Sequence, residues 1–480
     1  MWVKGLNAMT VMQENLKLPE AFLARMESEL GSEYEAFLKS YAEERAYGLR
    51  ANPLKADLNR FTELMPFTLE PVPWAEEGFY YNEADHPGRH VLHEAGAYYI
   101  QEPSAMSAAA ALSPEPGDRV LDLCAAPGGK STQIAGRLRG EGLLVANEIV
   151  PDRARILSQN IERLGVRNAV VTNESPENLR DRFTGFFDKI LVDAPCSGEG
   201  MFRKDENAAL EWSEENVKLC AERQAGILDC AAEMLRPGGV MVYSTCTFSK
   251  AENELNVEAF LKRHGDFSLE SAERFWPHRV KGEGHFVARL KRTEDGNGER
   301  YAGESPERAV MPAKSLKKAG KKGVSGGKGT SGGSTRQKGE AELKEFLVNE
   351  VGLLREAADK LFENADINYF GENVYLTPKS FGSLSGLSVV RPGLHIAVDL
   401  GNRLEPAHAL SMSLRPFEVS KRCGLSPDEA FKYQCGESIP CDMSLKGWCT
   451  VFTEGFSTGF GKASGGTLKN HYPKGLRIKI

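Results

Sequence analysis

Two cysteines follow apolar stretches that are typical of strands. Cys196 ends the sequence Asp-Ala-Pro-Cys at 193–196, and Cys246 lies in Ser-Thr-Cys-Thr at 244–247. Upstream, residues 125–130 read Ala-Ala-Pro-Gly-Gly-Lys. Glycines there let the backbone approach a ligand, and the helix that follows offers free N–H groups. A nucleotide-like cofactor beside a thiolate suits covalent catalysis, so the pattern predicts methyl transfer to a pyrimidine carbon that is not itself nucleophilic.

Such a reaction needs these residue types for a chemical reason. A thiolate that adds to carbon 6 of cytosine makes carbon 5 nucleophilic, and an acid near ring N3 eases the addition. Asp193 is the candidate for the acid near N3, and a second thiol is suited to assist the release of the product. The target base would have to leave its stack to reach the pocket. Spacing alone leaves open which thiol attacks, because enzymes that methylate cytosine in DNA use the thiol that follows proline.

Glu148 ends the next predicted strand, roughly 20 residues after the glycine turn, where an acid can bind both hydroxyls of a ribose. The alternative is a solvated carboxylate. Gly-Gly-Lys-Ser-Thr at 128–132 looks like a phosphate-binding loop but lacks the first glycine of that motif, which disfavours an ATPase. Cys220 and Cys230 lie on a predicted helix and are expected in the core. The other cysteines lack Cys-x-x-Cys spacing, so no metal site is predicted. They are Cys423, Cys435, Cys441 and Cys449.

Residues 118–290 must position these side chains, because predicted strands and helices alternate along them. Such alternation predicts an α/β fold, with a mostly parallel sheet covered by helices on both faces. Ligands in such sheets bind outside the carboxyl ends of the strands. One edge of the sheet should therefore carry Cys124, Glu148, Asp193, Cys196 and Cys246. The predicted strands are 120–126, 143–149, 169–173, 189–194 and 240–246. Three helices are predicted: one begins at 129, and the others span 152–164 and 222–235. Residues 236–239 are a stop signal for the last of them.

A chain of 480 residues is too long for one ordinary core. The N-terminal part should contain two helices at 18–46, the second capped by Ser32, a strand at 49–55 and irregular or hairpin structure at 66–100. A stretch rich in Gly, Ser and Lys cannot bury a core and should be a flexible linker. After it we expect a helix at 341–365 and then short strands and turns. The predicted domains are 1–105, 106–292, the linker 293–340, and a C-terminal region at 341–480.

The net charge of −7 and an isoelectric point near 5.9 do not by themselves suggest a nucleic-acid partner. The positive charge is unevenly distributed, however. Residues 308–339 contain nine Lys or Arg and residues 455–480 contain five, and neither stretch contains an acid. In the second stretch lysines alternate with aromatic residues, a composition that holds unpaired RNA by phosphate neutralisation and stacking; a solvated surface is the alternative. The lysines are Lys462, Lys469 and Lys474, and the aromatic residues are Phe456, Phe460 and Tyr472.

No apolar run reaches the roughly 18 residues that a membrane span needs, and the first residues lack the apolar stretch of a signal peptide. Nine cysteines at irregular spacing argue against a disulfide framework. We therefore expect a cytoplasmic protein and, by default, a monomer.

Several stretches resemble the RNA 5-methylcytosine methyltransferases of the NOL1/NOP2/Sun (RsmB/NOP) class, and within it the RsmF/YebU-type bacterial enzymes that act on 16S rRNA. The resemblance implies a Rossmann-like class I core that depends on S-adenosylmethionine. It also implies a small α+β N-terminal RNA-binding part and a PUA-like α+β C-terminal region. The implied reaction modifies C5 of a cytidine, with 16S rRNA or the small ribosomal subunit as partner. The matching stretches are 18–26, 48–55, 96–106, 121–130, 193–204, 244–249 and 455–477.

The resemblance also implies roles for individual residues. Cys246 would attack carbon 6, Cys196 would assist breakdown of the covalent intermediate, and Asp193 and Lys130 would complete the catalytic group. The implied cofactor contacts are Cys124, Ala125, Ala126, Pro127, Gly128, Gly129, Lys130, Glu148, Arg153, Ser175 and Asp193. The implied RNA contacts are Arg50, Asn52, Lys55, Arg203, Lys204, Lys462, Lys469 and Lys474.

One position departs from the family pattern, in which an Asp after the third strand often binds the adenine amino group. Here 172–175 reads Thr-Asn-Glu-Ser, so Ser175 has the expected spacing and Asn173 and Glu174 are alternatives. Rival interpretations are an enzyme acting on duplex DNA through Cys196, an enzyme acting on tRNA or another RNA, a small-molecule methyltransferase, and a non-enzymatic RNA-binding assembly factor. The intact thiol pair with Asp193 disfavours the assembly factor. The basic C-terminal stretch and the thiols disfavour a small-molecule substrate.

Overall fold

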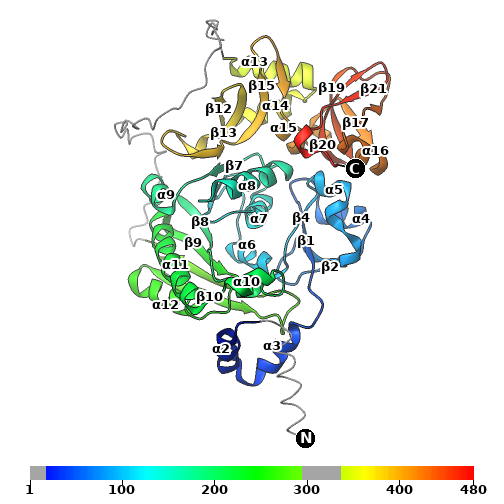
Figure 1. Cartoon of the computed structure of the whole chain (residues 1–480). Helices are drawn as coiled ribbons and strands as arrows, with labels where there is room; N and C mark the ends of the chain where they lie inside the picture. Colours follow the sequence, from blue (N-terminus) through cyan, green and yellow to red (C-terminus); the bar gives the residue numbers. More distant parts are fainter. Residues whose placement is uncertain (1–17, 295–336, 480) are drawn as a thin grey trace, which may run out of the picture.

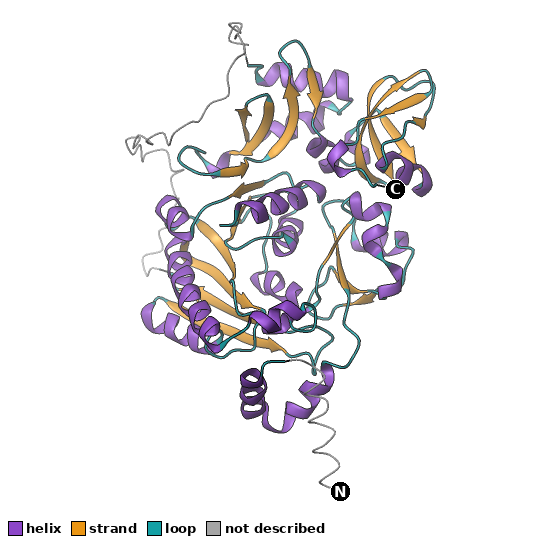
Figure 2. Ribbon diagram, in the orientation of Figure 1, coloured by secondary structure: helices purple, strands orange, loops and turns teal. Residues whose placement is uncertain are grey.

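The computed structural model describes residues 18–294 and 337–479, which form four sheets with surrounding helices (Figure 1, Figure 2). Residues 295–336, most of the predicted linker, lie outside the described part. In Figure 1 the largest sheet occupies the middle of the view, with the N-terminal helices below it and the C-terminal sheets above it. No helix in the described ranges is long and apolar enough to cross a membrane.

The N-terminal part contains an antiparallel sheet in the order β2-β3-β1-β4 and two helices that precede it. Phe37 packs edge-on against Phe248 and Trp276, so these helices rest on the domain that contains the central sheet, which we call the catalytic domain because residues 118–290 carry the predicted site. Ser32 lies inside a 3-10 turn (Gly31–Glu33), and Glu33 is the N-cap of the second helix, so the predicted cap is wrong. The elements are α2 (Glu20–Leu30), α3 (Tyr34–Ser40), β1 (Gly48–Ala51), α4 (Leu58–Leu64), β2 (Glu70–Pro71), β3 (Gly78–Tyr80), α5 (Val91–Glu94) and β4 (Tyr98–Ile100).

The central sheet has eight strands in the order β10-β11-β9-β8-β5-β6-β7-β14, and its middle five strands are parallel. Those five are β5 (Arg119–Asp122), β6 (Leu143–Asn147), β7 (Ala169–Thr172), β8 (Phe187–Asp193) and β9 (Leu235–Thr245). Alternate residues of β6 pack on opposite faces, Val145 in one apolar layer and Leu144 and Ala146 in the other. The predicted α/β fold with a mostly parallel sheet is therefore confirmed.

Helices cover both faces of this sheet. One face carries α6 (Ser107–Leu112), α7 (Gly129–Leu138) and α8 (Pro151–Arg163), and the other carries α9 (Pro176–Arg182), α11 (Glu214–Met234) and α12 (Glu254–Arg263). The short α10 (Glu206–Glu211) precedes α11. Short 3-10 turns lie at Glu83–Asp85, Pro87–Arg89, Ser104–Met106, Glu199–Met201, Lys379–Phe381, Pro416–Glu418 and Lys474–Leu476.

The sheet differs from the prediction at its edges. α11 begins eight residues before the predicted 222, and residues 236–239, predicted as a helix stop, belong to β9. Two antiparallel strands, β10 (Phe267–Phe275) and β11 (His285–Arg292), extend the sheet beyond β9 and were not predicted. The interior residues of β10 are mostly exposed, so this strand lacks the apolar run that identifies a buried strand in a sequence.

The C-terminal region forms two units, not one. The first contains the sheet β12-β13-β15-β16, and the second contains β17-β19-β20-β21-β18. α15 and α16 lie where only strands and turns were expected. The first unit comprises α13 (Glu340–Glu345), a π-helical segment (Phe346–Val351), α14 (Arg355–Glu363), β12 (Ala365–Phe370), β13 (Asn373–Pro378), β15 (Leu394–Asp399), β16 (Leu404–Pro406) and α15 (His408–Ser413). The second comprises β17 (Arg422–Leu425), α16 (Pro427–Gln434), β18 (Ile439–Pro440), β19 (Gly447–Thr453), β20 (Phe456–Ser464) and β21 (Thr467–Asn470).

Both C-terminal units are attached to the rest of the chain. β14 (Val389–Arg391) pairs with β7 at the edge of the central sheet, and Phe381 packs in the core of the catalytic domain. The second unit shares an apolar core with the N-terminal sheet, to which Leu49 and Tyr433 both belong. The catalytic domain therefore includes a strand from beyond the predicted boundary at 292.

Candidate active site

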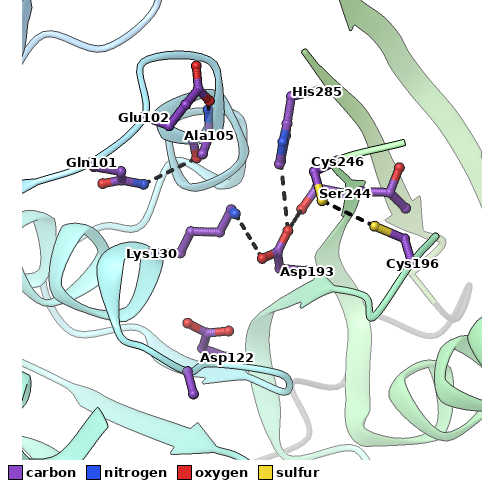
Figure 3. Close-up of polar contacts among 12 residues, drawn as sticks. Gln101, Glu102, Ala105, Asp122, Lys130, Asp193, Cys196, Ser244, Cys246 and His285 are labelled. Carbon is purple, nitrogen blue, oxygen red and sulfur yellow. Dashed lines mark hydrogen bonds and ion pairs between the residues drawn. The ribbon is translucent and has the colours of Figure 1, made fainter. Parts of the chain in front are cut away.

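The carboxyl ends of neighbouring parallel strands bring the predicted site residues together (Figure 3). Asp122 ends β5, Asp193 ends β8, and Cys246 directly follows β9. β5, β8 and β9 lie next to one another in the sheet, so their carboxyl ends meet at one edge, where ligands of such sheets bind. Cys196 lies on the loop after β8 and faces Cys246.

The two thiols are in contact. The Sγ atoms of Cys196 and Cys246 are 3.3 Å apart, and both side chains are partly exposed. The hydrogen bond to Cys246, together with burial, raises the pKa of Cys196 well above its ordinary value. The raised pKa favours the protonated form of Cys196, and either sulfur can be the donor in this contact.

A buried hydrogen-bond network fixes the loop that carries Cys196. The carboxylate of Glu252 accepts from the main-chain N–H of Ser197 at 2.9 Å, from its hydroxyl at 2.5 Å, and from Nε2 of Gln224 at 2.9 Å. Gln224 also donates to the carbonyl oxygen of Pro195 at 3.0 Å. Because Pro195 and Ser197 flank Cys196 on both sides, this network determines where its sulfur lies.

Gly200 lets the two cysteine loops approach each other. Its N–H donates to the carbonyl oxygen of Cys246 at 2.8 Å. A Cβ at this position would lie 3.0 Å from the same oxygen and 2.9 Å from the carbonyl oxygen of Gly284, too close for a side chain. The neighbouring Glu199 is buried and accepts from Arg25 at 2.6 Å, which ties the loop to α2.

Asp193 is held by side chains from several elements. Its Oδ2 accepts from Nζ of Lys130 at 2.8 Å, and its Oδ1 accepts from Oγ of Ser244 at 2.9 Å. Burial acts to raise the pKa of Asp193, but Lys130 and the hydrogen bonds outweigh it and lower that pKa. Burial acts to lower the pKa of Lys130, and the carboxylate more than compensates. Asp193 is therefore ionised and fixed in orientation.

A cavity of about 180 Å³ opens beside Asp193 and the glycine turn. Gly128 precedes α7 with a φ of 113°, a left-handed conformation that suits glycine and exposes the first N–H groups of the helix. The predicted cofactor contacts that line the cavity are Cys124, Ala125, Ala126, Pro127, Gly129, Lys130 and Asp193. Further lining residues, to which the sequence analysis gave no cofactor role, are Tyr99, Ile100, Gln101, Glu102, Ala105, Asp122 and Lys204.

Asp122 is a polar residue of this cavity that the sequence analysis missed, although its place at the end of a strand is a signal for it. Its Oδ2 accepts from the hydroxyl of Ser131 at 2.6 Å, whereas its Oδ1 is buried without a partner. Burial raises the pKa of Asp122 to about 7. A buried acceptor without a partner is costly unless a ligand supplies a donor.

The other predicted cofactor contacts lie around the glycine turn or beyond it. Glu148 is buried, accepts from the N–H of Val150 and forms an ion pair with Arg153 at 3.4 Å. Arg153 also donates to the carbonyl oxygen of Ala126 at 2.9 Å and so braces the turn. Ser175 is the N-cap of α9, where its hydroxyl accepts from an N–H of the helix. A contact between 173–175 and an adenine ring stays a prediction.

The N-terminal residues predicted to contact RNA are placed differently. Arg50 is 1% exposed, and its guanidinium donates to Gln101, to the carbonyl oxygen of Gly129 at 2.9 Å and to Thr132 at 2.7 Å. Asn52 is 3% exposed and donates to two main-chain carbonyl groups. Both side chains join the N-terminal part to the catalytic domain, so we assign them a packing role in place of the predicted RNA contact.

Lys55 and Arg203 are likewise engaged within the protein. Nζ of Lys55 donates to the carbonyl oxygen of Ala95, and burial lowers the pKa of Lys55 to about 7. Arg203 forms an ion pair with the buried Glu283 at 3.1 Å. We therefore assign these two residues to packing as well. Lys204, by contrast, is exposed and lines the cavity.

The C-terminal lysines are exposed, but the aromatic residues between them are not. Stacking of those rings on bases is therefore a wrong prediction. Lys462 and Lys469 lie opposite each other in β20 and β21, and with Lys446 they line a cavity of about 490 Å³. Nζ of Lys462 lies 5.4 Å from the ring centre of Trp448. The exposed lysines are Lys462, Lys469 and Lys474, and the buried aromatic residues are Phe456, Phe460 and Tyr472.

Cys220 and Cys230 are buried, as expected of core cysteines. Within the ranges 18–294 and 337–479, no group of three or more His, Cys, Asp or Glu could hold a metal ion.

The sheet order, the glycine turn before α7 and the cavity at the strand ends define a methyltransferase with a Rossmann-like core that uses S-adenosylmethionine. Family models match consecutive parts of the chain. They are the N-terminal domain of 16S rRNA methyltransferase RsmF at 18–103, 16S rRNA methyltransferase RsmB/F at 109–291, the RsmF rRNA methyltransferase first C-terminal domain at 353–414 and the methyltransferase RsmF PUA domain at 420–478.

Relatives match along nearly the whole chain. Ribosomal RNA small subunit methyltransferase F of Vibrio campbellii is 33% identical over 500 residues, which cover 97% of this chain and 98% of the relative. The protein of the same name from Klebsiella pneumoniae is 33% identical over 501 residues, with the same coverage. The chain therefore belongs to the 16S rRNA methyltransferase RsmB/F family.

Two solved structures have a fold similar to that of part of this chain. A methyltransferase homolog from Pyrococcus horikoshii is 28% identical, covers 59% of this chain and 99% of its own, and has a TM-score of 0.53. NSun6 from the same organism, 23% identical over 58% of this chain and 99% of its own, has a TM-score of 0.51 and shows the same fold.

Proposed function

We propose that this enzyme transfers a methyl group from S-adenosylmethionine to carbon 5 of a cytidine in 16S rRNA, through a transient bond between Cys246 and carbon 6. The observation that carries the proposal is the 3.3 Å contact between Cys196 and Cys246 beside Asp193. The group supplies a nucleophile, a donor for its release and a carboxylate for ring N3.

The asymmetry between the two thiols supports Cys246 as the nucleophile. The pKa of Cys196 is raised by its contact with Cys246 and by burial, which favours the protonated form of Cys196. Only a thiolate attacks, so Cys196 suits the supporting role. The rival arrangement, in which the cysteine after proline attacks, would require the protonated thiol to be the nucleophile.

The residues around the cavity fit S-adenosylmethionine. The unpartnered Oδ1 of Asp122 suits an ammonium group, and the free N–H groups at the start of α7 suit a carboxylate. S-adenosylmethionine carries both groups and, when bound, supplies an electrophilic methyl group. Residues 124–130 would hold it together with Asp122, Glu148 and Arg153, and 173–175 would contact its adenine.

The protein residues then act on the cytosine ring in order. The thiolate of Cys246 forms a bond to carbon 6, and an electron pair of the ring moves onto N3, which takes a proton that the ammonium group of Lys130 passes through the carboxyl group of Asp193. Carbon 5 gains the methyl group and then loses its proton to a base. The bond between sulfur and carbon 6 breaks as the double bond forms again, while the S–H of Cys196 donates to the departing sulfur.

The substrate follows from the family and from the exposed cations. The named relatives are enzymes of ribosomal RNA of the small subunit. Lys204 at the cavity and the exposed Lys462 and Lys469 can neutralise phosphates around a flipped-out cytidine. We place the enzyme, as a monomer, in the cytoplasm, where a reducing environment keeps both thiols free. Another RNA such as tRNA is the alternative substrate.

Bisulfite sequencing of total RNA tests the proposal, using a deletion strain, its parent and complemented strains. At least one 16S rRNA cytidine should lose its methyl group in the deletion strain. Wild type and Cys230→Ala, a substitution of a buried cysteine on α11, should restore it, whereas Cys246→Ala should not. Loss confined to tRNA would establish the alternative substrate, and restoration by Cys246→Ala would exclude the proposed nucleophile.

A further inference from the structure

His285 is a buried residue of the site that the proposed steps do not use. It begins β11 and is 4% exposed. β11 pairs with β9 so that Phe286 lies opposite Thr245, which places His285 beside the end of β9, next to Cys246. Figure 3 shows its ring directed at Asp193. Sequence analysis gave no signal for it, because β11 was not predicted.

The ring nitrogen that faces Asp193 lacks a hydrogen-bond partner. Nε2 of His285 is buried and lies 3.7 Å from Oδ1 of Asp193, which is beyond hydrogen-bonding distance. Oδ1 accepts one hydrogen bond, from Ser244, and a carboxylate oxygen can accept a second. A ring nitrogen without a partner, which is a donor in the Nε2–H tautomer, and an acceptor with free capacity thus face each other across a short gap.

His285 is uncharged, so it can donate a hydrogen bond to Asp193 without adding a positive charge beside it. Burial, and next the charge of Lys130, lower the pKa of His285 to about 3, so its ring is neutral at working pH and the 3.7 Å contact is no ion pair. Lys130 already lowers the pKa of Asp193. A second cation would lower it further and would make it harder for the ionised Asp193 to take up a proton and pass it to ring N3.

We propose that His285 is a positioning residue, whose Nε2–H closes on Oδ1 of Asp193 when cytosine enters and fixes the carboxylate against ring N3. Lys130 from α7 holds one oxygen, while Ser244 from β9 and His285 from β11 hold the other. The inference rests on the proposed function, because it requires Asp193 to act on the base.

Two substitutions separate the hydrogen bond from the packing of the ring. His285→Phe keeps an aromatic ring without a donor, and His285→Gln keeps a neutral N–H donor of similar reach. With 16S rRNA from a deletion strain as substrate, His285→Phe should lower kcat about 30-fold while both KM values change less than about twofold, and His285→Gln should recover kcat to within about threefold of wild type. If the Phe variant does not fold, His285→Asn, whose shorter amide falls short of Asp193, must show the same loss.

His278→Phe is the matched control. The side chain of His278 is also only 5% exposed and pairs with a carboxylate, that of Glu33 at 3.0 Å. The kcat of this variant should equal that of wild type. A second readout uses Cys196→Ala, in which the covalent adduct should accumulate. Adding His285→Phe should slow adduct formation about 30-fold, because Asp193 acts before methyl transfer.

The outcomes distinguish this inference from the function beneath it. A wild-type kcat in His285→Phe, or a loss that His285→Gln does not repair, would overturn the positioning role while adduct formation by Cys246 still stands. Absence of any adduct together with turnover by Cys246→Ala would overturn the proposed function, and the role of His285 with it.

Discussion

The carboxyl edge of the central sheet and the C-terminal surface around Lys462 both contain charged residues. The charges at the sheet edge are paired with each other, whereas those of Lys462 and Lys469 on the C-terminal surface are exposed and unpaired among the described residues. At the edge, Lys130 and Asp193 are paired at 2.8 Å, with side chains 12% and 28% exposed. On the C-terminal surface, Lys462 and Lys469 are exposed, and no ion pair within the described part of the chain includes them. Paired, largely enclosed charges are held in one orientation, as chemistry requires, whereas free cations attract phosphate at a distance.

Arg50 shows that sequence context alone does not separate these two states. It lies near aromatic residues in the chain, as Lys462 does, yet its guanidinium is buried and donates across the domain boundary. What decides the use of a cation here is whether other parts of the chain supply acceptors for it. Four variants test this contrast, and the largest effects are expected at the sheet edge.

Cys196→Ala should have the largest effect. Loss of the donor to the departing sulfur should lower turnover about 1000-fold, a size typical of general-acid groups, and should leave Cys246 bonded to RNA. A denaturing gel of enzyme mixed with 16S rRNA and S-adenosylmethionine measures the adduct directly. Lys462→Ala is the control and should give no more adduct than wild type. An adduct that forms in Cys246→Ala would reverse the roles of the two thiols.

Asp122→Asn should change how stability depends on pH. Burial raises the pKa of Asp122 from 3.8 to about 7, so its contribution to folding is fully present below about pH 4 and is lost as the pH rises through 7. The difference between those pKa values corresponds to about 4 kcal/mol at most. Thermal unfolding at pH 5 and pH 8 should show wild type losing stability relative to the variant. The exposed Asp152→Asn should behave as wild type, and parallel curves for Asp122→Asn would mean that this carboxyl group ionises normally.

Arg50→Met should destabilise the fold by about 2 kcal/mol, because it leaves acceptors on Gln101, Gly129 and Thr132 without their donor. Urea unfolding measures the change. Lys469→Met, the same exchange at an exposed site, should stay within about 0.5 kcal/mol of wild type. If Arg50→Met were as stable as wild type but bound RNA less tightly, Arg50 would have the RNA-contact role that the family resemblance implies, and the packing role would be wrong.

The parallel part of the fold could be predicted because its strands are apolar runs that end in polar residues. Leu143–Asn147, for example, is buried along its whole length. The antiparallel additions could not be predicted in the same way. β10 exposes most of its side chains, and β14 consists of three residues whose pairing with β7 depends on tertiary contacts. Local patterns do not contain that information.

The site could be predicted to the same extent. Residues 124–130, Asp193 and both thiols follow directly from strand ends and glycine spacing, and the structure brings them together. His285 reaches Asp193 only through the pairing of β11 with β9, so no local signal marks it. The basic residues also could not be told apart from the sequence. Lys469 is exposed, whereas Arg50 is buried and donates to acceptors from distant segments, which no local pattern reveals.

The smallest effect should come from the C-terminal surface. Replacing both Lys462 and Lys469 with Ala should weaken binding of 16S rRNA about fivefold near physiological salt and lower the slope of log Kd against log salt by about 1.4, with kcat unchanged. Lys432→Ala, an exposed lysine on α16, should leave both quantities as in wild type. Filter binding at several salt concentrations measures them. If kcat fell while affinity held, these exposed cations would belong to the chemistry, and the contrast between fixed charges at the sheet edge and free charges on this surface would fail.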